Sequence, residues 1–147
     1  MRFSAVVFLL LLATGCASSH SFDVSIRNAT DEPLTIGLVK YGPPMEPKWA
    51  SPEDVAIGSA TRQITRWGGL LPPEKMVMIH QDGHFGRGAR AFARIYAGDR
   101  TLSELLATGQ HDPSRLDMPL APGDNSFIVS YKAGKLVAQR INPTASP

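Results

Sequence analysis

The chain has 147 residues and a mass of 15.9 kDa, which is enough for one ordinary domain and too little for two. Hydrophobic residues make up 43% and charged residues 19%, so the composition is that of a globular protein rather than a disordered one. Fifteen Lys and Arg against thirteen Asp and Glu leave a formal charge of +2, which gives no reason to expect a nucleic-acid partner. A single cysteine excludes a disulfide framework and a multi-thiolate metal site.

The first sixteen residues have the pattern of an export signal. Arg2 and the amino terminus supply positive charge, and residues 5–13 form an unbroken apolar run of nine. Such a run is too short to span a membrane, which takes ~20 residues, but it is typical of the core of a signal peptide. The small residues Ala13, Thr14 and Gly15 then lead into Cys16, the only cysteine of the chain.

This stretch resembles the lipobox of bacterial lipoproteins. The resemblance implies a cut between Gly15 and Cys16, acyl chains on Cys16, and a membrane partner through that anchor. We therefore expect a signal peptide over 1–15 and a lipidated cysteine with a short linker over 16–21. Because Ala17 follows the cysteine where an aspartate would imply retention at the inner membrane, the resemblance implies an outer-membrane protein facing the periplasm. The alternative is ordinary secretion, with residues 15–17 as a plain small-x-small cleavage site.

The domain is expected over residues 22–141, with a flexible tail over 142–147. Strict alternation of apolar and polar residues predicts strands over 22–28 and 34–41, joined by a turn-forming Asn28–Pro33 corner as a hairpin-like pair. A pair of this form resembles the opening of many immunoglobulin-like sandwich domains.

Further elements follow in chain order. A proline-rich loop over 42–50 precedes a short helix starting at Ser51, and strands are expected over 60–67, 75–80 and 89–97. The segment 68–73 is predicted to be a turn, and the glycine-rich segment 82–88 is predicted to be a loop.

A second helix and three strands complete the domain. The Thr101–Glu104 capping box predicts a helix, and the helical spacing of Leu102, Leu105 and Leu106 predicts that these three leucines cover an open end or face of the sandwich. A short edge strand over 116–120 and a hairpin of 125–131 with 135–141 are predicted after it.

The sum is an antiparallel, immunoglobulin-like β-sandwich of about seven to eight strands with one or two short helices. Alternation predicts which side chains form its core: Phe22, Val24, Ile26, Ile36, Leu38, Phe127, Val129 and Val137.

Met76, Met78 and His80 form a candidate soft-metal site. Residues two apart share one face of a strand, and two thioethers with an imidazole favour Cu(I). In the alternative interpretation, the methionines pack in the core and His80 is only the end of the strand.

Arg90 and Arg94 form a candidate binding site, because they share a strand face with Phe92 and Tyr96. A basic and aromatic face can bind a glycan, a nucleic acid or a partner strand. In the alternative interpretation, the arginines are solvated while their aliphatic stems cover the sheet.

No motif of hydrolytic catalysis is present in the sequence, and the sole thiol is assigned to the anchor. We therefore expect a lipid-anchored envelope protein that is a non-enzymatic binding or structural module, with no cofactor and an envelope protein as a partner. A periplasmic copper-binding or copper-transfer protein is the alternative.

Overall fold

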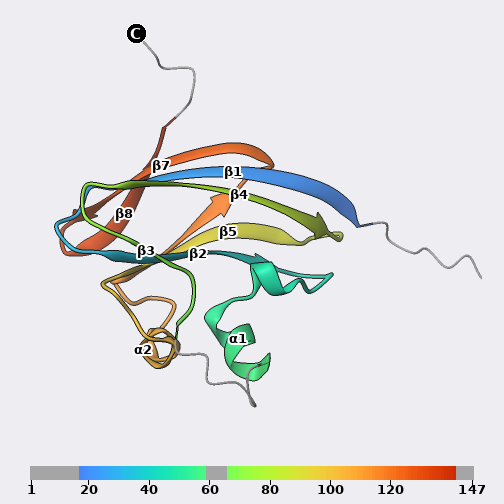
Figure 1. Cartoon of the computed structure of the whole chain (residues 1–147), viewed down its shortest axis with the longest axis horizontal. Coiled ribbons are helices and arrows are strands. Elements are labelled where there is room, and N and C mark those ends of the chain that lie inside the picture. The colour runs from blue at the N-terminus through green and yellow to red at the C-terminus, as the bar shows by residue number, and fades with distance from the viewer. Residues whose placement is uncertain (1–16, 59–65, 142–147) are drawn as a thin grey trace, which may run out of the picture.

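The computed structural model describes residues 17–58 and 66–141, and this part of the chain forms a β-sandwich of two four-stranded sheets (Figure 1). The first sheet has the order β4-β1-β7-β8, and the second has the order β3-β2-β5-β6. The strands of the first sheet are β4 (Met76–Phe85), β1 (Ser18–Asn28), β7 (Gly123–Lys132) and β8 (Lys135–Arg140). Those of the second sheet are β3 (Gly69–Leu71), β2 (Leu34–Tyr41), β5 (Arg90–Ala97) and β6 (Arg115–Leu120). The mainly β fold expected from the sequence is confirmed.

The first two strands do not pair with each other, which corrects the expected hairpin. β1 lies antiparallel to β4 and parallel to β7, whereas β2 lies between β3 and β5 in the other sheet. Asn28 explains the crossing, because its buried side-chain amide donates to the carbonyl oxygens of Glu32 (2.8 Å) and Leu71 (3.1 Å). The corner thus carries the chain from one sheet to the other.

The core lies between the sheets and contains seven of the eight side chains predicted for it: Phe22, Val24, Ile26, Ile36, Leu38, Phe127 and Val129. Val137 is the exception, since it is only half-buried while its neighbour Leu136 is buried. Strand β8 therefore has the opposite face inward from the one predicted. A shift of one residue exchanges the two faces of a strand, and β8 alternates weakly because Leu136, Val137 and Ala138 are all apolar.

Two segments differ from the expected elements. β4 continues through the glycine-rich segment to Phe85, where Gly83 is buried against the indole of Trp49 and the ring of Phe85. The segment predicted as a turn over 68–73 contains the short edge strand β3. The strand expected over 60–67 lies almost entirely outside the described residues.

A second, smaller core lies on the outer side of the second sheet. It is formed by Val39, Trp67, Tyr96, Leu102 and Leu105, below the sheet in Figure 1, where the helices α1 (Pro52–Gly58) and α2 (Leu102–Ala107) lie. This face of β2 and β5 is therefore covered rather than open to solvent.

The capping box of α2 is confirmed. The backbone N–H of Glu104 donates to Thr101 Oγ1, and Glu104 Oε2 accepts from the backbone N–H of Thr101 at 2.8 Å. Leu102 and Leu105 pack inward as expected. Leu106 is 44% exposed, so the expectation that this third leucine also packs against the sheet is wrong. In the described part of the chain, no helix is long and apolar enough to cross a membrane.

Candidate functional site

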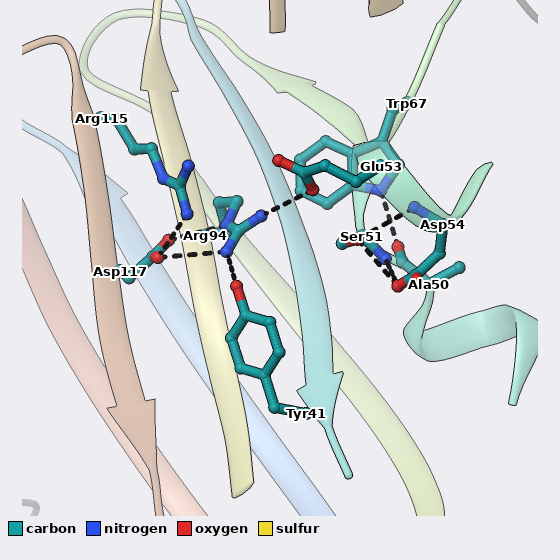
Figure 2. A network of polar contacts seen from close by, with 9 residues as sticks. All are labelled: Tyr41, Ala50, Ser51, Glu53, Asp54, Trp67, Arg94, Arg115 and Asp117. Atoms are coloured by element: carbon teal, nitrogen blue, oxygen red, sulfur yellow. Dashed lines mark hydrogen bonds and ion pairs between the residues drawn. The ribbon is translucent and has the colours of Figure 1, made fainter. Parts of the chain in front are cut away.

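The most polar buried site centres on Arg94, on the outer side of the second sheet. β5 runs beside β6 with Arg94 opposite Asp117, so the two side chains meet on one face. Arg94 Nε donates to Asp117 Oδ1 at 2.8 Å and Nη2 donates to Asp117 Oδ2 at 3.2 Å, which is a bidentate pair. Nη1 donates to Glu53 Oε2 at 3.2 Å, and Nη2 also donates to the hydroxyl of Tyr41 (Figure 2).

Arg115 adds a second cation to this cluster. Its Nη2 donates to Asp117 Oδ2 at 2.9 Å, so Asp117 accepts from two guanidinium groups. Burial raises the pKa of Asp117, but the hydrogen bonds from Arg94 and Arg115 outweigh burial and hold that pKa below its usual value. Burial lowers the pKa of Arg94, and Asp117 more than restores it, so both groups are charged near neutral pH.

Trp67 lies beside Tyr96, on the same side of the second sheet as α1. Its indole N–H donates to the carbonyl oxygen of Ala50 at 2.8 Å, and its ring meets the ring of Tyr96 edge to face at 6.0 Å (Figure 2 shows Trp67 and Ala50). Gly37 on β2 leaves the room for this indole, because a Cβ there would lie 2.6 Å from the Trp67 ring. Backbone and side chains together exclude water from one side of Arg94.

Two buried polar atoms beside the cluster have no hydrogen-bond partner among the described residues: Tyr96 Oη and Arg115 Nε. The Tyr96 side chain is wholly buried, and burial raises the pKa of its hydroxyl. The cluster is thus a closed polar bridge that joins β5, β6 and α1.

Arg90 and Arg94, the two arginines of the expected basic face, differ in exposure in the structure. Arg94 is 0% exposed and its guanidinium is used by Asp117, Glu53 and Tyr41, so the interpretation of it as a solvated arginine is wrong. Arg90 is exposed at the end of β5. A surface ligand can therefore reach Arg90 but not Arg94.

The soft-metal candidates lie on the outer face of the first sheet. Met76 is 61% exposed and Met78 is 79% exposed, while Val77 and Ile79 pack against the core. The interpretation that these methionines are core residues is therefore wrong. The exposed side chains share one face of the edge strand β4 with His80.

His80 already has a partner in this sheet. Its Nδ1 lies 2.7 Å from Asp23 Oδ1 on β1, and the hydrogen bond and charge of Asp23 raise the pKa of the imidazole above its usual value. Its Nε2 lies 3.7 Å from Asp82. Among the described residues, no group of three or more His, Cys, Asp and Glu side chains is placed to hold a metal ion. A metal here would have to use the two thioethers.

Sequence reasoning missed four members of the Arg94 cluster: Tyr41, Glu53, Arg115 and Asp117. Arg115 and Asp117 alternate with Leu116 and Met118, which indicates that the two charges share a face of one strand. Their partner on β5 depends on the register between strands 20 residues apart, for which the pattern contains no signal. Cys16 lies outside the described residues. The chain matches no protein family, no curated protein and no solved structure.

Proposed function

We propose that this chain is a lipid-anchored β-sandwich of a bacterial cell envelope, acylated on Cys16, that acts as a binding or structural module rather than as an enzyme. The observation that carries the proposal is the pattern of residues 1–16, in which an apolar run ends in small residues and the only cysteine. The structure supports a domain held close to its anchor, since β1 begins at Ser18, two residues after Cys16. The residue after the cysteine, Ala17, supports the outer membrane and a domain in the periplasm.

The mode of action is inferred from how the polar groups are used. The buried charges of Arg94 and Lys40 both form ion pairs with carboxylates of this chain, Asp117 and Glu46, which is how buried charges contribute to architecture. The exposed groups are those of strand faces, edges and loops, where proteins bind other molecules. An envelope protein is the partner we propose for such a module.

Lipidation is tested with Cys16→Ser, and Ser19→Ala at an exposed neighbouring position is the matched control. Wild type and Ser19→Ala are expected in the membrane fraction with acyl chains detectable by mass spectrometry on the first residue of the cut chain. Cys16→Ser is expected in the soluble fraction or uncut. A correctly cut Cys16→Ser protein that stays in membranes washed with high salt, or a wild-type protein without acyl chains, would refute the anchor.

A copper-binding function is the second candidate, and the exposure of Met76 and Met78 favours it. Two adjacent thioethers on one strand face are soft ligands open to solvent, and the imidazole of His80 lies two residues further along that face. Cu(I) titration of the chain from residue 16 with Cys16→Ser tests the site without the thiol. Binding that survives Met76→Leu/Met78→Leu as well as it survives the control Met45→Leu, at another exposed methionine, would exclude it.

A further inference from the structure

One end of the sandwich lies beside Ser18, the first residue of β1, and we name it the proximal end. β1 begins there at Ser18, opposite Phe85 at the end of β4. The β4–β5 loop follows over 86–89, and β2 ends there at Tyr41, opposite Arg90. β1 starts and β4 ends at the right of Figure 1, and the turn between β7 and β8 lies at the other end of the first sheet.

The proximal end carries positive charge that has no acid to neutralise it. Arg87 and Arg90 flank the turn of the β4–β5 loop, are exposed, and have no ion pair or hydrogen bond from their side chains within 17–58 and 66–141. Two carboxylates near this end, those of Glu46 and Asp82, are engaged. Glu46 Oε2 lies 2.5 Å from Lys40 Nζ, and Asp82 lies 3.7 Å from His80.

A cavity of about 490 Å³ with a mainly apolar lining opens beside Arg90. Arg90 and His20 contribute to its polar lining, and Phe22, Phe85, Leu120 and Pro122 contribute to its apolar lining. Unpaired guanidinium groups next to an apolar opening suit a ligand with a phosphate and a hydrocarbon part.

We infer that the proximal end is a lipid-binding surface, at which Arg87 and Arg90 contact the phosphates of an anionic phospholipid bilayer and the cavity beside them faces its apolar layer. The inference rests on the proposed anchor for its orientation. Ser18 is two residues from Cys16, a reach of about 7 Å at ~3.6 Å per residue, so an acylated Cys16 would hold this end against the membrane. The near-neutral net charge hides this local asymmetry.

Vesicle binding by the chain from residue 16 with Cys16→Ser tests the surface without any acyl chain. The described structure lies wholly within 17–141, so this chain contains the folded unit. Sedimentation with vesicles of phosphatidylcholine containing phosphatidylglycerol is the measurement, and phosphatidylcholine alone is the reference. A basic side chain near an anionic surface contributes ~1 kcal/mol, so Arg87→Gln/Arg90→Gln is expected to weaken binding about 30-fold.

The matched control is Lys132→Gln/Lys135→Gln, which removes the same charge from the opposite end of the sandwich. It should bind like the parent, and thermal melts check that both variants are folded. Added salt should weaken the parent's binding, because screening shortens the reach of the charges.

Three outcomes would overturn the inference: no binding to the anionic vesicles, equal binding to neutral and anionic vesicles, or equal losses in the two variants. A chain that binds no vesicle but captures an envelope protein through Arg87 and Arg90 would likewise reassign the surface to a protein partner. A wild-type protein that carries no acyl chain on residue 16, with vesicle binding intact, would refute only the proposed lipidation. Confirmed lipidation without vesicle binding would refute only this surface.

Discussion

Removing Arg94 and removing Asp117 should each destabilise the fold, but by different amounts. Asp117→Leu leaves two cations, Arg94 and Arg115, in a cluster whose remaining acid is the half-exposed Glu53. Arg94→Met removes one cation and leaves Asp117 bound to Arg115 at 2.9 Å. The loss of the acid should therefore cost more than the loss of the central cation.

The magnitudes follow from burial. The Arg94 side chain is 0% exposed and that of Asp117 is 25% exposed, so the pair lies mostly out of water. An uncompensated buried charge costs about 3–5 kcal/mol, and we expect this for Asp117→Leu. Arg94→Met should cost about 1–2 kcal/mol, because the acid retains a charged donor and the Tyr41 hydroxyl, on a 45% exposed residue, can bind water.

Urea melts at pH 7 give the free energy of unfolding of each variant. Glu53→Gln is the matched control, because its half-exposed side chain should contribute less than about 1 kcal/mol. The ranking Asp117→Leu, then Arg94→Met, then Glu53→Gln is the expected result. An Arg94→Met protein as unstable as Asp117→Leu would show that packing of the arginine stem, not charge balance, holds this cluster together.

Three further predictions concern the frame of the domain. Leu105→Ala should lower the free energy of unfolding in urea melts by about 2–5 kcal/mol, because Leu105 is fully buried beside Trp67. Leu106→Ala, at an exposed position, should melt close to wild type, and equal losses in the two variants would contradict the packing of α2. The hydrogen bond from Lys40, opposed by burial, lowers the pKa of Glu46 from 4.5 to about 2, so the stabilisation that ionised Glu46 provides is present above pH 4.5 and is lost as pH falls toward 2. The difference in unfolding free energy between wild type and Glu46→Gln should therefore shrink across that window, and a constant difference would contradict the coupling of stability to this pKa. Asn28→Ala should lower the free energy of unfolding by about 2–4 kcal/mol, because the Asn28 side chain makes four hydrogen bonds where the chain passes from one sheet to the other. A free energy of unfolding within about 0.5 kcal/mol of wild type would show that Asn28 does not stabilise this corner.

Part of the candidate site was predictable from local pattern. Alternation along β5 places Arg94 on the face opposite Ala93 and Ile95, and that face assignment is correct. The burial of Arg94 was not predictable in the same way, because it depends on α1 and Trp67 covering that face and on β6 pairing beside β5. An arginine on a strand face is solvated or buried according to its neighbours, and the two carboxylates that pair with Arg94 lie 23 and 41 residues away in the sequence.

The exposure of Met76 and Met78 is a second case in which the sequence pattern did not predict burial. Their alternation with Val77 and Ile79 identifies two faces that are both apolar, so the pattern alone cannot say which one meets the core. The pairing of β4 with β1 decides it, since β4 turns the same face inward as Val24 and Ile26.

The sequence by itself determined the features that depend on neighbours along the chain. Period-two alternation predicts the inward faces of β1, β2 and β7; the Thr101–Glu104 pair predicts α2; and Ala133–Gly134, both at positive φ, form the turn between β7 and β8. Tertiary structure alone decided which strands pair, including the parallel contact of β1 with β7, and which charges are buried. The physical reason is range: backbone geometry and capping act within a few residues, whereas strand partners and burial are set by the lowest free energy of the packed sheets as a whole.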